Sequence, residues 1–312
     1  MCGGLYMKME ELVQKKLCLV FNDDSIMFDK SRFAGGLTNY NYIMNINGKQ
    51  YVVRQPGAMT NLMIDRKIES VNDKIAAELG LNSECIYFDE DSGIKISAYI
   101  ENSKNIAQAD PCSPATLRSV STLMKKTHSS KKCFSNSFNW QMELNKYESI
   151  IQKLNGDFFF DYATLKKQLL DFMEKNIKKI ISVPCHNDTV PENFLVDGKG
   201  KTYLIDWEYS GMNDPSWDVA SYILESRLTE EAIQYLLVDY YGQFPSHEEM
   251  VKIKSYMVAQ DLLWMVWAMI RHYSGDDFLD YCCFRYERFQ RNVKAITNSS
   301  DYSIADMVKK CE

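Results

Sequence analysis

The residues best suited to chemistry lie within residues 184–220. His186, Asp188 and Asn193 form an HxDxxxxN pattern, and Asp206 comes directly after a short strand-like run. Phosphoryl transfer needs one carboxylate to orient a hydroxyl, and an amide with a second carboxylate to hold Mg²⁺. The order and spacing of these residues therefore predict a kinase that acts on a small molecule.

The surroundings of this pattern strengthen the prediction. Residues 193–196 and 202–205 read as two short strands around the turn 197–200, and Asp206 follows the second strand. A hairpin of this kind brings Asn193 and Asp206 to the same end. The alternative, that Asp188 and Asp206 are only turn and cap residues, remains open.

The first third of the chain alternates as a small antiparallel sheet does. Residues 28–33, 40–46 and 50–54 are predicted strands, and a glycine-rich loop joins the first two. Such a loop allows backbone N–H groups to approach phosphate oxygens, although an ordinary hairpin would look the same. The candidate nucleotide-binding residues of this loop are Gly35, Gly36, Thr38 and Asn39.

A buried cation is predicted on the third strand. Arg54 ends an apolar run and needs an acid nearby. Glu69 lies in a helix predicted over residues 64–79 and is a candidate partner, although it also fits a solvated charge on a polar face. After two further strands, the chain turns polar at residues 101–103, where a hinge between lobes is expected. Backbone groups near the hinge would face an adenine, at Ser97, Tyr99 and Ile100.

The remainder of the chain is mostly helical in pattern. Helices are predicted over residues 114–127, 139–154, 162–181, 217–226, 229–241, 246–273 and 278–295. A sheet first and helices later, with the hairpin between them, predict an α+β fold of two lobes, residues 1–100 and 101–312.

Composition narrows the class of protein. The chain has 312 residues, 46% of them hydrophobic, a net charge of −6 and a pI of about 5.4, which argue against a nucleic-acid partner. Nine cysteines without paired spacing indicate a reduced, cytoplasmic protein. No apolar run is long enough to span a membrane. Met7 and Met9 are possible alternative start positions.

Several motifs together resemble the choline kinase family, in particular its bacterial members, within the wider group of choline/ethanolamine and aminoglycoside phosphotransferases. They read GGLTNYNY, YVVRQPG, HNDTVPENFL, LIDWEYSGMNDPSWDVA and WMVW. The resemblance covers roughly residues 28–289 and implies a protein-kinase-like fold and transfer of the γ-phosphate of ATP to an alcohol with Mg²⁺.

The resemblance also implies a role for each matching residue. Asp188 would be the catalytic acid that orients or deprotonates the hydroxyl, and His186 would brace its loop. Asn193, Asp206 and Glu208 would hold metal, Arg54 and Glu69 would hold phosphates, and Asp218 would bind backbone around the catalytic loop. Trp207 follows Asp206 where protein kinases have phenylalanine, so a mobile activation segment is not expected.

The substrate is predicted from aromatic residues. A trimethylammonium group has no N–H donors, so it is held by cation–π contacts and nearby carboxylates. Trp264 and Trp267 lie on one helical face, and Tyr209 and Tyr281 add two rings; the resemblance places these positions and Glu225 around choline. A tryptophan pair at this spacing also fits an ordinary core.

Other functions stay open. An ethanolamine kinase would need more acceptor groups, an aminoglycoside phosphotransferase would need a broad acidic surface, and a kinase-fold binding module would have no need of Asp188, Asn193 and Asp206. His128 and His247 have no acid or cysteine partner at ligand spacing and are expected to be structural or solvated. Oligomeric state is not predicted. The favoured prediction is a choline kinase that uses ATP and Mg²⁺.

Overall fold

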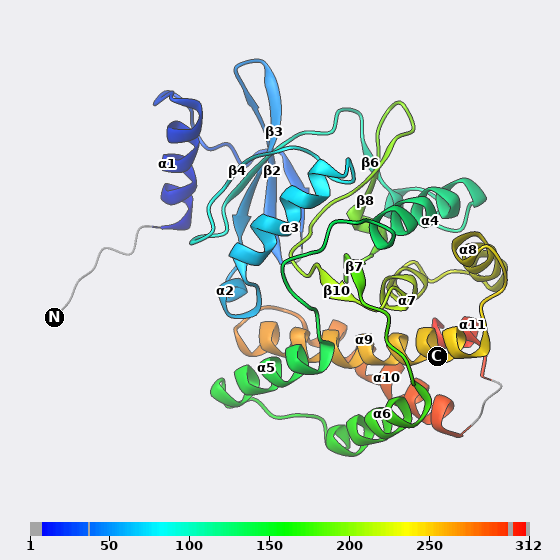
Figure 1. The fold of residues 1–312 in the computed structure, drawn as a ribbon. Helices are drawn as coiled ribbons and strands as arrows, with labels where there is room; N and C mark the ends of the chain where they lie inside the picture. The colour runs from blue at the N-terminus through cyan, green and yellow to red at the C-terminus, as the bar shows by residue number, and fades with distance from the viewer. Residues whose placement is uncertain (1–7, 37, 299–301, 310–312) are drawn as a thin grey trace. The chain divides into compact units, whose positions relative to one another are not determined.

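The computed structural model describes residues 8–36, 38–298 and 302–309. The chain divides into two compact units, of which the first ends at Asn102 and the second begins at Ser103 (Figure 1). Met7, one of the two possible start positions, lies outside the described residues, whereas Met9 begins the first helix. The two units are described separately below.

The first unit is a five-stranded antiparallel sheet with helices on its faces. The strand order is β1-β2-β3-β5-β4. The elements are α1 (Met9–Phe21), β1 (Phe33–Gly35), β2 (Asn39–Ile46), β3 (Lys49–Pro56), α2 (Thr60–Met63), α3 (Arg66–Glu78), β4 (Cys85–Phe88) and β5 (Lys95–Ala98). The strand predicted over residues 28–33 is wrong, because pairing with β2 begins only at Phe33. The sequence analysis did not predict α1.

The two faces of this sheet differ in chemistry. Val53 and Ile96 pair in register and pack with Val13 of α1 in one apolar cluster. The neighbouring residues, Arg54 and Lys95, also pair in register and point to the opposite face, since side chains alternate along a strand. An apolar face therefore lies against α1, and a charged face lies against α3.

Helix α3 buries its polar side, which reverses the pattern expected from the sequence. Asp65 caps the helix by accepting hydrogen bonds from the amides of Lys67 and Ile68. The buried positions are Arg66, Glu69, Asn72, Asp73 and Ala76. Val71, expected on the apolar face, is instead 45% exposed. The solvated alternative for Glu69 is therefore wrong, because the cations of the sheet attract the acidic side of α3.

The second unit is mostly helical, with two small sheets. Its strands are β6 (Lys104–Asn105), β7 (Val183–Cys185), β8 (Phe194–Val196), β9 (Thr202–Leu204) and β10 (Gly211–Asn213). Its helices are α4 (Pro114–His128), α5 (Trp140–Lys153), α6 (Tyr162–Asn176), α7 (Ser216–Glu225), α8 (Glu230–Tyr241), α9 (His247–Tyr273), α10 (Leu279–Asn298) and α11 (Ile304–Met307), and short 3₁₀ turns cover Ile106–Gln108 and Pro191–Asn193.

Helix α9 forms the centre of the second unit. It begins with a capping box at Ser246 and Glu249, and α5, α6, α7 and α10 pack around it (Figure 1). The hairpin β8–β9 forms in the predicted place, with Phe194 opposite Leu204. Helix α6 ends at Asn176 and not at residue 181, because Ile177 adopts an extended conformation that leads the chain toward β7.

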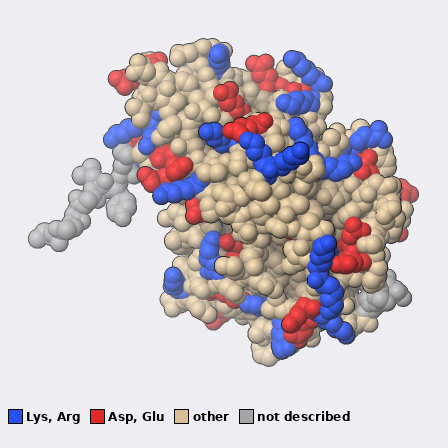
Figure 2. Space-filling view, in the orientation of Figure 1, with Lys and Arg blue, Asp and Glu red and all other residues tan. Residues whose placement is uncertain are grey.

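Several general predictions can be compared with the described residues. No helix among them is long and apolar enough to cross a bilayer. The seven cysteines among them are free thiols. On the face drawn in Figure 2, acidic side chains lie interspersed with basic ones.

Candidate active site

The catalytic loop follows β7 and is anchored by Asp218 of α7. The carboxylate of Asp218 accepts hydrogen bonds from the backbone amides of His186 (2.8 Å) and Asn187 (2.7 Å). Its backbone carbonyl accepts a hydrogen bond from Thr189. Asn187 has a φ of 68°, a strained conformation for a residue with a side chain. The anchored loop therefore turns sharply just before Asp188, as the backbone-binding role suggested for Asp218 requires.

His186 braces the loop from within. Its Nδ1 accepts a hydrogen bond from the amide of Asp188 at 3.3 Å, and its Nε2–H donates to the carbonyl of Ile205 at 2.9 Å. Burial lowers the pKa of His186, so the ring stays neutral and keeps this arrangement. His186 thereby connects the loop to the end of the β8–β9 hairpin.

Asn193 and Asp188 lie in direct contact. The Nδ2 group of Asn193 donates to the backbone carbonyl of Asp188 (2.9 Å) and to its carboxylate (3.2 Å). Both amide hydrogens therefore serve to orient Asp188, and the carbonyl oxygen of the Asn193 side chain remains the group suited to a metal ion. Both residues of this contact belong to the second unit.

Two more carboxylates gather near Asp188. Burial raises the pKa of Asp188 well above its usual range, and the negative charges of Asp206 and Glu208 raise it further. Asp206 has a φ of 67°, and Trp207 after it is fully buried, with its indole N–H donating to the carbonyl of Leu204. The backbone around Asp206 and Trp207 thus holds the carboxylates close together. Carboxylate oxygens are the donors that Mg²⁺ prefers.

His128 corrects one expectation from the sequence. It is buried, and its Nε2 lies 3.0 Å from the carboxylate of Asp218, while Nδ1 lies 2.6 Å from the hydroxyl of Tyr240. The prediction that His128 has no acid partner is wrong, because α4 and α7 are distant in sequence and adjacent in space. Its structural role is supported, since it holds the residue that anchors the catalytic loop. His247 is exposed at the start of α9.

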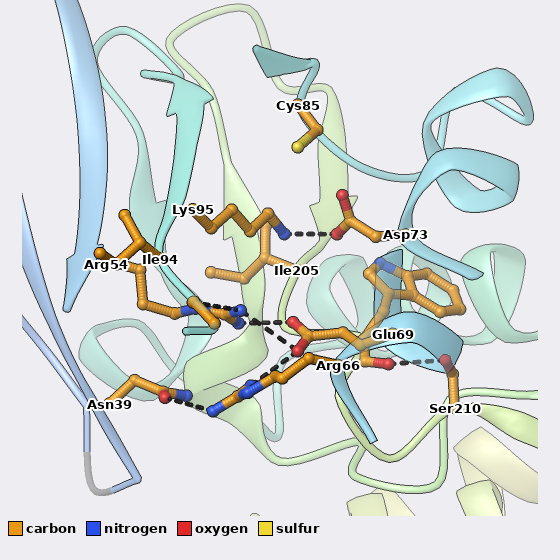
Figure 3. Close-up of polar contacts among 12 residues, drawn as sticks. Asn39, Arg54, Arg66, Glu69, Asp73, Cys85, Ile94, Lys95, Ile205 and Ser210 are labelled. Atoms are coloured by element: carbon orange, nitrogen blue, oxygen red, sulfur yellow. Dashed lines mark hydrogen bonds and ion pairs between the residues drawn. The ribbon is translucent and has the colours of Figure 1, made fainter. Parts of the chain in front are cut away.

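In the first unit, two arginines converge on Glu69. Arg54 donates to both carboxylate oxygens of Glu69 and also to the carbonyl of Gly93 (Figure 3). Arg66 donates to the same carboxylate at 2.6 Å and to the Oδ1 atom of Asn39 at 3.0 Å. Burial alone would raise the pKa of Glu69, but the charges of Arg54 and Arg66 outweigh it and lower the pKa to about 2. The predicted pairing of Arg54 with Glu69 is present.

A second ion pair lies one helical turn further along α3. Lys95 donates to the carboxylate of Asp73, and Asn82 donates to the same carboxylate at 2.7 Å (Figure 3). Like charges directly opposite each other on neighbouring strands destabilise a sheet. Arg54 and Lys95 are opposite each other, and each is neutralised by an acid on α3. The sequence analysis missed the pair of Lys95 with Asp73. The signal was the spacing of Glu69 and Asp73, because residues four apart lie on the same face of a helix.

The glycine-rich loop has the conformation expected of its residues. Gly36 has a φ of 128°, and a Cβ there would lie 1.9 Å from the carbonyl oxygen of Asn39. Gly35 has a φ of 102° but open space around it. Thr38 is half-buried, and Asn39 is buried. The tight loop therefore needs glycine at position 36 for its own packing, and Gly35 leaves room beside the backbone.

The residues predicted near the hinge lie in β5 and just after it, where the strand pairs with β3 and β4. Ser97 lies inside the ladder, opposite Val52 on one side and Cys85 on the other. The amide of Tyr99 donates to the carbonyl of Gln50 at 3.2 Å. Ile100 follows directly after this last hydrogen bond and precedes the boundary between the two units.

The predicted aromatic residues gather in the second unit. Tyr209 contacts Trp264 edge to face with ring centroids 5.0 Å apart, and Trp267 contacts Tyr281 at 6.4 Å. Phe278 completes the group at 5.3 Å from Trp267. The two tryptophans are nearly buried, as the alternative of an ordinary core also requires. Both expectations are compatible with this packing.

Glu225, which the resemblance places around choline, belongs to a network of ion pairs. Arg285 of α10 donates to its two carboxylate oxygens at 2.6 and 2.8 Å, and to the hydroxyl of Tyr281 at 2.5 Å. Burial would raise the pKa of Glu225, but Arg285 and Arg288 hold it below its usual value. Asp261 of α9 accepts from both arginines. Sequence reasoning missed Arg285, Arg288 and Asp261, because the sequence does not show which charged residues of these helices are buried.

Tyr147 is another residue that the sequence analysis missed. It is fully buried on α5, and burial raises its pKa, with further contributions from the charges of Glu208 and Asp188. Its hydroxyl and that of Tyr209 are buried without a hydrogen-bond partner of ordinary length. The only signal in the sequence is a tyrosine in the apolar stripe of the predicted helix.

An antiparallel sheet with an Arg–Glu pair, a braced loop that carries Asp188, and acids after the following hairpin define a phosphotransferase of the kinase-like fold. Known proteins agree. The family model described as choline/ethanolamine kinase matches residues 31–252. Protein LicA of Haemophilus influenzae is 34% identical over 260 residues, which are 81% of this chain and 76% of that protein.

Solved structures give the same result. The choline kinase LicA from Streptococcus pneumoniae is 29% identical and superposes with a TM-score of 0.77, over 92% of this chain and 99% of that one. A LicA structure in complex with AMP is also 29% identical, with a TM-score of 0.79 over 93% of this chain and 99% of that one. The chain belongs to the choline/ethanolamine kinase family, and the predicted family and α+β fold are confirmed.

Proposed function

We propose that the protein is an ATP-dependent choline kinase, which transfers the γ-phosphate of ATP to the hydroxyl of choline and yields phosphocholine and ADP. The observation that carries the proposal is the arrangement around Asp188: His186 fixes its backbone, and Asn193 orients its carboxylate. Membership of the family and the AMP complex of a relative support the phosphotransferase class and the adenine nucleotide.

Asp188 is the proposed catalytic residue. Its carboxylate accepts a hydrogen bond from the choline hydroxyl, aligns that oxygen with the γ-phosphate and takes the proton as the new bond forms. Burial and the nearby charges of Asp206 and Glu208 raise the pKa of Asp188, so its proton affinity is higher than that of an ordinary aspartate. The contact from Asn193 keeps the carboxylate in one orientation during this transfer.

Mg²⁺ is the proposed cofactor, and the residues present fit it. The side-chain carbonyl of Asn193 and the carboxylates of Asp206 and Glu208 are oxygen donors, and their crowded negative charge favours a cation. When bound, Mg²⁺ neutralises charge on the phosphates of ATP. Trp207 and the left-handed backbone at Asp206 hold these donors in place.

The first unit is proposed to bind the nucleotide. Two arginines gather around one glutamate, and guanidinium N–H donors of this kind suit a phosphate. The loop residues Gly35, Gly36, Thr38 and Asn39 would lie along the phosphates, and the strand end at Ser97, Tyr99 and Ile100 would face the adenine. A cytoplasmic location is part of the proposal, because the phosphate donor is made there.

The choline head group is proposed to bind among the aromatic residues of the second unit. Tyr209, Trp264, Trp267 and Tyr281 offer ring faces and edges, and each cation–π contact with a quaternary ammonium contributes about 0.5–2 kcal/mol. Glu225 adds negative charge at the edge of this group. Ethanolamine is the second candidate substrate, because the family includes kinases for both alcohols.

The test is ADP release with Mg-ATP and, in separate reactions at matched concentration, choline, ethanolamine, homoserine or an aminoglycoside. We expect the highest kcat/KM with choline. A clear preference for ethanolamine would replace the substrate and keep the catalytic residues. If no alcohol stimulates ADP release, the proposed function is wrong.

A further inference from the structure

The charged group beside the aromatic residues is balanced within itself. It contains two acids, Glu225 and Asp261, and two arginines, Arg285 and Arg288. The two arginines and Asp261 are buried, with side chains at most 3% exposed. The group therefore carries no net charge in a place where an unpaired charge would be costly.

Arg285 has a distinct position in this group. One terminal nitrogen donates to Glu225 and Asp261, and the other donates to Glu225 and to the hydroxyl of Tyr281. Its guanidinium carbon also lies 4.9 Å from the centre of the Tyr281 ring. Arg285 therefore fixes an acid and an aromatic residue of the proposed choline site at once.

Arg288 makes a different set of contacts. It forms a two-point pair with Asp261 at 2.6 and 2.8 Å and stays 3.7 Å from the nearest oxygen of Glu225. Its guanidinium stacks on Phe284 and not on Tyr281. The two arginines carry the same charge in the same network, but only Arg285 contacts the residues proposed to meet the substrate.

These contacts distinguish two kinds of ammonium group. A primary ammonium has three N–H donors and loses water on binding, so it needs acceptor atoms in the site. Each oxygen of Glu225 already accepts one hydrogen bond from Arg285, as does the hydroxyl of Tyr281, so fewer lone pairs remain for a primary ammonium, and the carboxylate charge is already paired. A trimethylammonium group has no N–H donors and loses nothing when those acceptors are occupied.

We propose that Arg285 is a specificity-determining residue, which favours a quaternary over a primary ammonium substrate by occupying the acceptor atoms of Glu225 and Tyr281. This inference rests on the proposed function of the site. Arg285 acts by positioning its neighbours and takes no part in the transfer itself.

The test compares Arg285→Lys with the matched control Arg288→Lys. Lysine keeps the positive charge but cannot reach Glu225 and Tyr281 with a planar fork. In Arg285→Lys we expect the ratio of kcat/KM for ethanolamine to that for choline to rise about tenfold, with the KM for ATP unchanged. In Arg288→Lys the ratio should stay within about twofold of the wild type, although thermal stability falls.

Arg285→Met is the second variant and should raise the ratio further, because Glu225 then keeps only the longer contact to Arg288. Adding Glu225→Gln to Arg285→Met should cancel most of that gain. A ratio within about twofold of the wild type in the folded Arg285 variants, or an equal rise in Arg288→Lys, would overturn the inference. A wild-type protein without choline-dependent ADP release would instead overturn the proposed function.

Discussion

The two units of this protein each contain a buried network of arginines and acids, and the two networks differ in how the arginines share the carboxylates. In the first unit, Arg54 and Arg66 share the single carboxylate of Glu69. In the second, Arg285 and Arg288 face two carboxylates, Glu225 and Asp261. The first network gathers guanidinium donors and is proposed to meet an anion, whereas the second pairs each arginine with a carboxylate and is proposed to meet a cation without N–H donors.

The difference shows that similar ion pairs can serve opposite ligands. A buried pair contributes little net stability once its desolvation is counted, but removal of one partner is costly. What distinguishes the networks is therefore how the arginines share the carboxylates and not the stability that each bridge contributes. Neither network contains the group that takes the proton.

The first prediction tests Asp188, the proposed proton acceptor, which belongs to neither network. Asp188→Asn keeps the shape of the side chain but cannot accept the proton, so kcat should fall by about 10²–10⁴. Stability toward urea should be unchanged or higher, since one of several crowded carboxylates is neutralised. Steady-state kinetics and urea unfolding measure the two effects. Asp171→Asn, at an exposed position on α6, is the control, and retention of normal turnover by Asp188→Asn would exclude the proposed mechanism.

The second prediction breaks the first network at its acid. Glu69→Gln removes the carboxylate charge that the buried Arg54 and Arg66 share, so the free energy of unfolding should fall by about 3–5 kcal/mol. Glu143→Gln removes a half-exposed pair with Lys146 and should cost less than about 1 kcal/mol. Urea unfolding monitored by tryptophan fluorescence compares them. Equal losses in the two variants would contradict the distinction between buried and surface pairs.

A third variant removes one of the two arginines that contact Glu69. Arg66→Met keeps the pair of Arg54 with Glu69 but loses the contact to Asn39 of the glycine-rich loop. The KM for ATP should rise about tenfold, because a charge-assisted contact of this kind contributes about 1.5–3 kcal/mol, while the KM for choline stays the same. Lys67→Met, on the exposed side of the same helix, is the control. A matching rise in the choline KM would show that the charge does not act on the nucleotide alone.

The fourth prediction uses pH. The pKa of Glu69 is lowered from 4.5 to about 2, so its ionised form contributes stability above pH 4.5 that is lost as the pH falls toward 2. Between pH 7 and pH 4, Glu69 should account for a decrease of about 1 kcal/mol in the free energy of unfolding. Urea titrations at both pH values, in the wild type and in Glu69→Gln, measure this decrease. The glutamine variant should lack that share of the pH dependence, and an identical dependence in both proteins would argue against the lowered pKa.

The catalytic loop could be predicted from the sequence because its chemistry is local. Asp188 and Asn193 stand five residues apart, and the hairpin that follows has its own turn signal. The partners of Glu225 could not be predicted in the same way. Arg285 of α10 pairs with both Glu225 of α7 and Asp261 of α9, and the relative rotation of these helices depends on packing. Before that packing is known, a buried charge on a helix cannot be distinguished from a solvated one.

The fold shows the same limit. The sheet and most helices followed from alternation and helical periodicity. Helix α3 was predicted in the right segment but with the wrong side inward. The prediction followed the apolar periodicity, whereas in the structure Arg54 and Lys95 attract the acids of the helix toward the sheet. Helix α1 was missed, because its role is to cover an apolar sheet face that the sequence does not reveal.

The two acids of α3 also have a mechanical consequence. Glu69 and Asp73 are one turn apart and face Arg54 and Lys95, so the helix is fixed to the sheet at two points along its axis. A slide of a fraction of a turn would break both bridges together, whereas a slide of one whole turn, about 5.4 Å, would form one of them again with a new partner. Any movement of α3 along the sheet would therefore proceed in steps of one helical turn, since intermediate positions lose both bridges.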